Sequence, residues 1–492
     1  MKRTVLGFSF ITLWLFVISE RIQEAITFPS TFDDNIISIS LLNYRKNEAV
    51  KERIKLAPTN NYMINITAIP STISFLIFQV HTYQYNITLS YDKLNLNKVS
   101  NRSLFGSNVG LYIVPKKKET TFFIRNNNVR HVETLLAVVP YLKQAPVPGG
   151  CNMEFNIEVA PYQKLFVNDS IVILDSQPAS LPLTSNETQR SCIFAETYRL
   201  FLTKQDYSIE SYFNAISSML TVTDILRNGE KIPASTINPL RRINNLYYGI
   251  GTVYAAIATY GNDSSAYVPT FTYGFNYVLH PEDDKFLNDT LSKLLCILMC
   301  IVGSLCVLQG HKYPEMEFVV YTTFFGGIIS YIVVKSFATY DVRNSPAILE
   351  NDWLFWPIYL FIALIVTIIL IAMPCFALTL TCAVLGGFTV VLSIAYFANS
   401  NLVYIIINVI RRLTVSWFNY AIVSLPLQSK DMILIVFWVF LAIVRIHSED
   451  VFRDFFNNLY WKVCRRDFKS IESDKAFEDI PLYKYRVLDY FN

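Results

Sequence analysis

The residue types that perform catalysis or hold metals are few in this chain, and they do not fall at catalytic spacings. The five histidines are His81, His131, His280, His311 and His447, and no two of them lie at a spacing typical of metal ligands. The sequence has no HExxH, CxxC pair, GxSxG or phosphate-loop motif. We therefore expect no catalytic residues, no metal site, no cofactor and no enzymatic activity.

The cysteines predict one disulfide rather than a redox or metal site. Of the eight cysteines, only Cys151 and Cys192 precede residue 291. Two lone cysteines in an oxidising compartment usually pair. A Cys151–Cys192 bond would close a loop of about 40 residues and contribute about 3–4 kcal/mol in the chain-entropy model. The alternatives are two buried free thiols or a bond between chains.

N-glycosylation sequons lie on one side of the chain only. All seven precede residue 291, in the region that holds the two pairing cysteines. Because only a luminal or extracellular segment can carry glycans, this distribution predicts that residues 20–290 lie outside the cytosol. The expected acceptors are Asn65, Asn86, Asn101, Asn168, Asn186, Asn262 and Asn288.

The N-terminus has the pattern of a secretory signal peptide. Lys2 and Arg3 precede an uncharged stretch from Val5 to Ile18, and Ser19 suits a cleavage site. The apolar stretch is shorter than the ~20 residues that a spanning helix needs. We predict a signal peptide over residues 1–19, with an uncleaved anchor as the alternative.

The composition indicates a membrane protein. Among the 492 residues, 52% are hydrophobic and 16% are charged, whereas globular proteins average about 25% charged residues. The net charge of +3 implies no particular partner. The chain is mixed in polarity up to residue 290, and long uncharged runs follow.

The outer region reads as two β-rich ectodomains, 20–146 and 147–290, each a β-sandwich-like domain. Short β-branched and aromatic runs alternate with turn signals there. The stretch APVPGG, residues 145–150, predicts a linker and a strand start between the domains. One helix is expected over 209–226. The expected strands lie within 71–83, 83–91, 110–115, 120–126, 132–142, 151–162, 170–176, 192–202, 244–260 and 264–277.

Residues 291–447 read as an α-helical multi-span membrane bundle, followed by a cytosolic tail at 448–492. The run 353–397 has 45 residues without a charge, too long for one span, and Pro374 marks its reversal. Residues 401–425, with Arg411 and Arg412, read as an interfacial or re-entrant helix. Pairs of small residues, such as Ala383 with Gly387, suit helix packing. The expected spans are 291–308, 316–334, 353–373, 376–397 and 432–446.

Several stretches together resemble the transmembrane 7 superfamily member 3 family. They are STISFLIFQVHTYQYNITLSY, VPGGCNMEFNIEVAP, SSAYVPTFTYGF, TCAVLGGFTVVLSIAYF and NLVYIIINVIRR, in this order between about residues 60 and 445. The resemblance implies a glycosylated multi-span protein without established enzymatic activity, associated with cell survival and with restraint of endoplasmic reticulum stress. It also implies seven spans, two more than the five found, and the shortfall lies at 335–352.

Other functions remain open from the sequence. A membrane conduit, for example for RNA uptake, a receptor and an ectoenzyme are the alternatives to a non-enzymatic partner-binding protein. The basic segment 114–131 is read as a solvated hairpin, so nucleic acid is not expected as a partner. We expect the lipid bilayer, an unidentified protein partner of the ectodomain, and a possible oligomer. The secretory pathway is the expected location, with the plasma membrane favoured over the endoplasmic reticulum.

Overall fold

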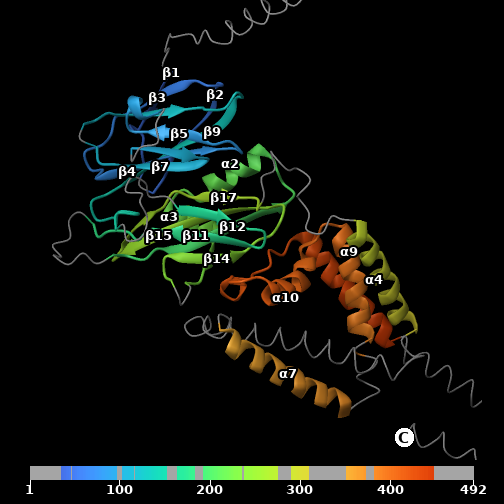
Figure 1. Cartoon of the computed structure of the whole chain (residues 1–492). Helices are drawn as coiled ribbons and strands as arrows, with labels where there is room; N and C mark the ends of the chain where they lie inside the picture. The colour runs from blue at the N-terminus through green and yellow to red at the C-terminus, as the bar shows by residue number, and fades with distance from the viewer. Residues whose placement is uncertain are drawn as a thin grey trace, which may run out of the picture. The chain divides into compact units, whose positions relative to one another are not determined.

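In the computed structural model, the chain forms two compact units, Met1–Asp284 and Lys285–Asn492 (Figure 1). The structure describes residues 35–45, 47–96, 102–115, 117–151, 163–182, 192–234, 238–274, 290–309, 351–372, 380 and 382–447. The expected signal peptide, the expected span 316–334 and the expected tail 448–492 lie outside these residues.

The first β domain is a sandwich of two sheets. One sheet has the order β1-β3-β8-β5-β6 and the other β2-β9-β4-β7. All pairings are antiparallel except β1 with β3. The strands are β1 (Asn35–Ser40), β2 (Val50–Leu56), β3 (Asn61–Thr67), β4 (Phe75–Thr82), β5 (Ile87–Ser90), β6 (Ser103–Gly106), β7 (Asn108–Ile113), β8 (Thr120–Arg125) and β9 (Val132–Tyr141); a short 3-10 helix, η1 (Lys93–Asn95), follows β5.

Alternation of side chains builds the core between these two sheets. In β3 the burial alternates residue by residue, so Tyr62, Ile64 and Ile66 point into the core. Phe78 of β4 meets Phe122 of β8 across the sandwich, with ring centroids 5.5 Å apart. The first predicted β-sandwich is therefore present.

Strands β4 and β9 differ because both of their faces are buried. All eight residues of β4 are buried, as are nine of the ten residues of β9. The face that points away from the first core carries Ile77, Leu135 and Val139, which pack against side chains of the second β domain. The two domains therefore share apolar clusters and form one packed ectodomain.

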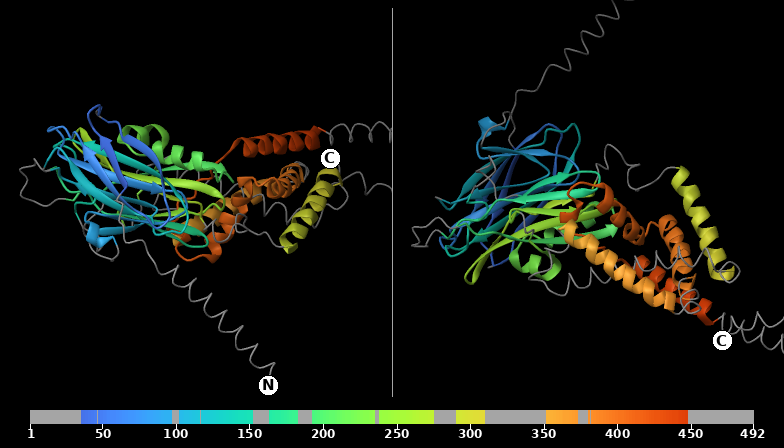
Figure 2. Two further views of the ribbon diagram at one scale, coloured as in Figure 1. Left: turned by 90° about the horizontal axis from the view of Figure 1, so that it is seen from above. Right: turned by 60° about the horizontal axis from the view of Figure 1, so that its bottom comes forward.

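The second β domain also has two sheets. Figure 2 shows its strands, coloured green to yellow-green, from two further sides. The orders of the two sheets are β10-β11-β14 and β13-β12-β15-β16, and β17 pairs with β15. The elements are β10 (Gln163–Val167), β11 (Ile171–Ser176), β12 (Glu196–Lys204), α2 (Ile209–Ser217), α3 (Val222–Asn228), β13 (Glu230–Ile232), β14 (Arg241–Asn245), β15 (Ile250–Tyr260), β16 (Asp263–Ala266) and β17 (Thr270–Thr272). The second predicted β-rich domain is also present.

Two predicted elements of this domain are each divided in the structure. The single helix expected over 209–226 is α2 and α3, because Thr221 caps α3 by accepting a hydrogen bond from the Asp224 backbone N–H at 3.2 Å. The strand expected over 244–260 is the end of β14 and all of β15. A turn separates them at Gly249, whose φ of 72° suits glycine.

The predicted linker APVPGG is packed rather than free. Ala145 and Val147 are buried among residues of both domains. Val147 also pairs with Ser180 of the second domain through two backbone hydrogen bonds of 3.0 Å. Because its backbone and side chains are held in this way, the connection orders the two domains instead of letting them move independently.

The second unit is helical. Among its described residues, α4 alone is long and apolar enough to cross a membrane, and shorter apolar helices cover 352–368 and 382–397. The elements are α4 (Thr290–Gln309), α7 (Asp352–Ala372), the π-turn η3 (Cys382–Gly386), α9 (Gly387–Phe397), η4 (Asn401–Val403), α10 (Tyr404–Thr414), η5 (Phe418–Tyr420) and a helix over 429–447. The predicted spans 291–308 and 432–446 fall on helices, and 353–373 and 376–397 do so over their described parts.

Small residues let these helices approach closely. A Cβ at Gly303 of α4 would meet Thr389 and the backbone oxygen of Gly386, and one at Gly386 would meet Cys306 and Val307. Later residues of α4 therefore face earlier residues of the η3–α9 segment, so the two run antiparallel. The expected packing site at Ala383 and Gly387 is also in contact, since Ala383 is fully buried and a Cβ at Gly387 would lie 3.2 Å from Trp438.

Candidate functional site: an aromatic cleft between the two β domains

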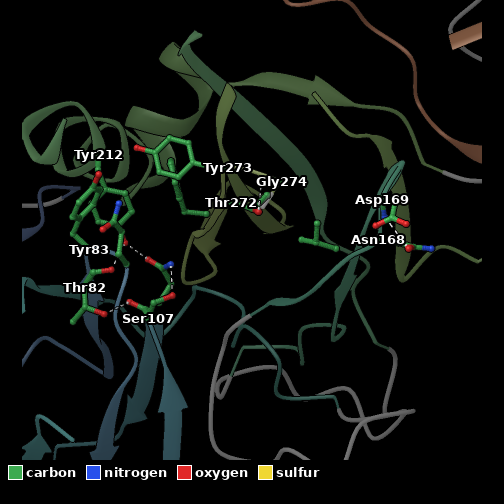
Figure 3. A pocket seen from close by; sticks show the side chains of 13 residues that line it. Thr82, Tyr83, Ser107, Asn168, Asp169, Tyr212, Thr272, Tyr273 and Gly274 are labelled. Carbon is green, nitrogen blue, oxygen red and sulfur yellow. Dashed lines mark hydrogen bonds between the residues drawn. The ribbon is translucent and has the colours of Figure 1, made fainter. Parts of the chain in front are cut away.

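A cleft of about 450 Å³ opens where the two β domains meet (Figure 3). The first domain supplies the end of β4 and the start of β7. The second supplies α2, β17 and the β10–β11 turn. The lining residues are Thr82, Tyr83, Gln84, Ser107, Asn108, Val167, Asn168, Asp169, Tyr212, Phe271, Thr272, Tyr273 and Gly274.

Aromatic rings form one wall of the cleft. Tyr212 of α2 contacts Phe271 of β17 with ring centroids 4.8 Å apart, and Phe271 contacts Tyr273 at 4.7 Å. Tyr83 approaches Tyr212 at 5.4 Å from the other domain. All three pairs meet edge to face, the favoured geometry for aromatic rings. The wall is therefore preformed by side chains of both domains.

Hydrogen bonds fix the hydroxyl groups of this wall. Tyr212 donates to Asn108 Oδ1 at 2.9 Å and to the Thr82 backbone oxygen at 3.0 Å. Tyr273 donates to the Asp206 backbone oxygen at 3.2 Å. Burial raises the pKa of both phenols above its ordinary value, so they stay neutral donors. The wall can bind a ligand but offers no activated nucleophile.

A buried histidine supports the polar side of the cleft from beneath. His81 is fully buried, with Nδ1 2.8 Å from Asn108 Oδ1 and Nε2 3.0 Å from Gln79 Oε1. Desolvation lowers the pKa of His81 to about 4, despite the opposing effect of its hydrogen bond to Asn108. A neutral ring has a single N–H, which donates to Asn108 Oδ1 in one tautomer and to Gln79 Oε1 in the other, and Asn108 Oδ1 also accepts from Tyr212.

The rim opposite the aromatic wall is an exposed turn. The Asp169 backbone N–H donates to Asn168 Oδ1 at 2.8 Å, and Tyr248 donates to the Asp169 backbone oxygen at 2.7 Å. The turn is thus held in place while the Asp169 carboxylate stays accessible. Aromatic faces, one carboxylate and fixed amides can bind a ligand that presents both apolar and polar groups.

The described sequons have different accessibilities. Asn86, Asn168 and Asn262 are exposed, and Asn168 lies at the cleft rim. Asn65 lies in the middle of β3 with its Oδ1 buried and without a hydrogen-bond partner. The other expected acceptors, Asn101, Asn186 and Asn288, lie outside the described residues.

The two outer cysteines are joined. Cys151 and Cys192 form a disulfide with their Cα atoms 5.8 Å apart. The Cys151 backbone N–H donates to the Pro178 backbone oxygen at 3.1 Å, and Ile193 pairs with Ala179. The bond therefore fastens the end of the interdomain connection to the second domain.

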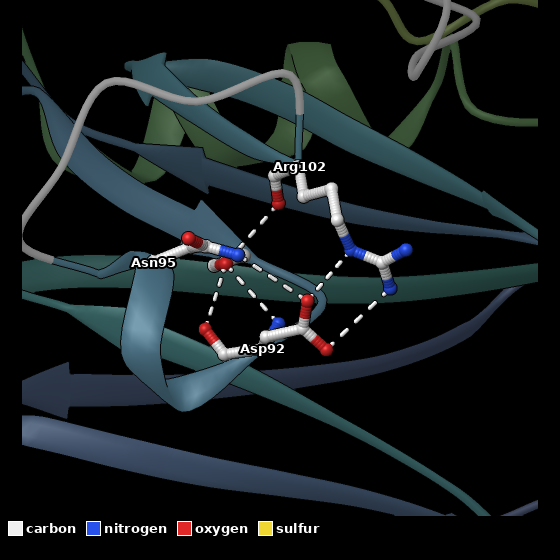
Figure 4. Close-up of polar contacts among 4 residues, drawn as sticks. Asp92, Asn95 and Arg102 are labelled. Atoms are coloured by element: carbon white, nitrogen blue, oxygen red, sulfur yellow. Dashed lines mark hydrogen bonds and ion pairs between the residues drawn. The ribbon is translucent and has the colours of Figure 1, made fainter.

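One charged cluster at the surface of the first domain has a local structural explanation. Arg102 forms an ion pair with Asp92 at 2.6 Å and lies over the Tyr91 ring, and Asn95 also contacts Asp92 (Figure 4). In the basic segment 114–131, Phe122 is buried in the core and is not available to stack on a base. Among the described residues, no group of three or more His, Cys, Asp or Glu side chains could hold a metal ion.

The sequence alone did not identify the cleft. Its residues are dispersed from Thr82 to Gly274 and carry no motif. A usable signal was present in β4 and β9, which are almost continuously apolar (FLIFQVHT and VETLLAVVPY) and so predict burial on both faces. A sheet of that kind requires a second layer, which is where the cleft forms.

Comparisons with known proteins agree along most of the chain. Residues 42–141 match the TM7SF3-like N-terminal immunoglobulin-like domain, 146–278 match the TM7SF3-like second immunoglobulin-like domain, and 342–448 match the TM7S3/TM198-like domain. The chain is 23% identical over 442 residues to human transmembrane 7 superfamily member 3, covering 76% of this chain and 77% of that protein. The rat protein of that name is 23% identical over 445 residues, covering 77% and 78%. A periplasmic lysozyme inhibitor from Aeromonas hydrophila is similar over 22% of this chain, at 9% identity and a TM-score of 0.14, which is too low to bear on the fold.

Proposed function

Because this chain belongs to the transmembrane 7 superfamily member 3 family, we propose that it is a non-enzymatic, glycosylated multi-span membrane protein that binds a partner through its ectodomain. The two immunoglobulin-like domains face the lumen or the extracellular space. Partner binding restrains endoplasmic reticulum stress and supports cell survival. The proposed roles in endoplasmic reticulum stress and cell survival rest on the resemblance of the sequence to this family.

The single observation that carries the binding role is the cleft between the domains. Its aromatic wall is built from Tyr212, Phe271 and Tyr273, and its rim carries the Asp169 carboxylate. Immobile rings bind with little loss of conformational entropy, and one charged group gives orientation. A protein partner would insert a short polar segment that carries a basic side chain toward Asp169.

The binding role is tested by reversing the charge at the rim. Cells that lack this protein are treated with thapsigargin and supplied with the wild-type chain or with Asp169→Arg. We expect the wild type to restore survival and to lower a stress reporter, and Asp169→Arg to fail. Asp263→Arg is the matched control, since Asp263 lies in the β15–β16 hairpin and does not line the cleft.

The outcomes separate the parts of the proposal. Full rescue by Asp169→Arg at normal expression removes the cleft as the binding site. Failure of the wild-type chain to change survival removes the stress role. Resistance of the mature glycans to endoglycosidase H, which we expect, supports transport beyond the endoplasmic reticulum to the plasma membrane. The absence of any glycan on the chain would overturn its luminal or extracellular orientation.

A further inference from the structure

The helix α10 has an inverted distribution of polarity. Its buried side carries Tyr404, Ile407, Asn408 and Arg411, and Asn408 and Arg411 are only 4% and 3% exposed. The opposite side carries Ile406, Ile410 and Leu413, and Trp417 follows three residues after the helix ends; we call these four residues the apolar stripe. These four side chains are 36–65% exposed. A helix on a water-exposed surface has the reverse arrangement, with its apolar side packed inward.

The segment that contains α10, residues 401–425, begins and ends at one junction, where the end of α9 contacts the start of the 429–447 helix. The Asp431 carboxylate accepts hydrogen bonds from Ser400 Oγ at 2.5 Å and from the Asn401 backbone N–H at 2.8 Å. Asn401 Nδ2 also donates to the Pro426 backbone oxygen at 2.8 Å. The end of α9 and the start of the 429–447 helix are therefore fastened together.

The two helices that flank this segment run antiparallel. Trp438 Nε1 donates to the Val384 backbone oxygen at 2.9 Å, far along both helices from the junction at Ser400 and Asp431. Residues 401–425 are thus an insertion at the tip of a helical hairpin. An element that leaves and returns at the same tip does not cross the membrane.

Contacts with other helices locate this tip. Arg412 forms an ion pair with Asp352 at 2.9 Å, and its guanidinium lies 3.6 Å from the centre of the Phe355 ring. Both partners are in the first turn of α7. Because α9 runs antiparallel to α4, the end of α9 lies on the membrane face where α4 begins. The start of α7 contacts α10, and the start of the 429–447 helix contacts Ser400 and Asn401, on that same face.

We propose that residues 401–425 form a membrane-interface element, whose apolar stripe contacts lipid on the membrane face at which α4 begins. With eleven residues, α10 is about 16 Å long, half of the ~30 Å hydrocarbon thickness. Interfacial helices bury an apolar side at the boundary between headgroups and acyl chains, and tryptophan is enriched at that depth. Trp417 follows the helix at the end of the stripe.

Cysteine labelling in sealed membranes tests the sidedness. Leu94→Cys, Leu427→Cys and His447→Cys are made one at a time in the full chain and treated with a membrane-impermeant maleimide before and after permeabilisation. Leu94 is 87% exposed in the ectodomain and marks its side. We expect Leu427→Cys to label with Leu94→Cys, and His447→Cys to label on the opposite side. Leu427→Cys on the side opposite to Leu94→Cys would mean that 401–425 crosses the membrane, which overturns the proposal.

Labelling rates test the lipid contact. Ile410 and Leu427 have the same exposure of 53% in the protein. We expect Ile410→Cys in membranes to react at least tenfold more slowly than Leu427→Cys, with equal rates after denaturation in dodecyl sulfate. Equal rates in membranes would show that the stripe faces water and would overturn the lipid contact. Because these results are read relative to Leu94→Cys, they are independent of which compartment holds the ectodomain.

Discussion

The phenol of Tyr212, in the second β domain, donates a hydrogen bond to Asn108 Oδ1 in the first, and both residues line the same cleft. Tyr212→Phe removes the hydroxyl group that donates to two buried acceptors, Asn108 Oδ1 and the Thr82 backbone oxygen. We expect the free energy of unfolding of the ectodomain to fall by about 1–2 kcal/mol. Thermal and urea unfolding measure it. Tyr248→Phe is the control. It removes an exposed hydrogen bond from the Tyr248 hydroxyl to the Asp169 backbone oxygen and should lower the free energy of unfolding by less than about 0.5 kcal/mol.

The buried His81 should make the ectodomain sensitive to acid. Its folded-state pKa of about 4 lies below the reference of 6.5, so the unfolded chain binds a proton at a higher pH than the folded chain. The stability from the neutral ring is complete above pH 6.5 and is lost as pH falls toward 4, by roughly 3 kcal/mol in total. Urea midpoints at pH 7, 5.5 and 4.5 measure the loss. His81→Gln should flatten this dependence, whereas replacing the exposed His131 should not; identical slopes in His81→Gln and wild type would contradict the assignment.

Gly110 permits the close approach of the two β domains. A Cβ there would lie 2.5 Å from Val268 Cγ2 and 2.9 Å from the Phe78 backbone oxygen. We expect Gly110→Ala to destabilise the ectodomain by about 1–3 kcal/mol through overpacking. Adding Val268→Ala should recover part of this loss, because it removes the clash with the Val268 side chain but leaves the clash with the Phe78 backbone oxygen. Strict additivity of the two substitutions in a double-mutant cycle would show that they do not meet.

Gly303 should be required for the α4–α9 contact. A leucine there would collide with Thr389 and the Gly386 backbone. We expect Gly303→Leu to separate the two helices, so that little of the full chain acquires endoglycosidase H-resistant glycans. Leu298→Ala is the control, because Leu298 lies on α4 with 56% of its side chain exposed and a smaller residue collides with nothing. Wild-type maturation of Gly303→Leu would argue against the contact.

The sequence predicted what local patterns encode and missed what tertiary packing decides. Strands with alternating polarity, such as β3 and β8, meet the ordinary expectation for a half-buried strand. The break between α2 and α3 was readable in Thr221-Val222-Thr223-Asp224, a helix-capping sequence, but the apolar residues on both sides obscured it. The cleft was beyond reach, since Asn108 and Tyr212 meet only after two separate domains have stacked. The inverted polarity of α10 likewise becomes meaningful only once Asp431 is seen to close the hairpin.

The burial of β4 and β9 on both faces has a consequence for synthesis. The ribosome completes β9 at Tyr141, but β15, which covers that face, ends at Tyr260. At a translation rate of roughly 5–20 residues per second, the apolar outer face of this sheet stays exposed to solvent for on the order of ten seconds. During that interval the nascent first domain is a natural client for chaperones, and a truncated first domain would remain one permanently. Truncating the chain at the boundary between the two domains therefore does not yield a first domain with a fully covered sheet.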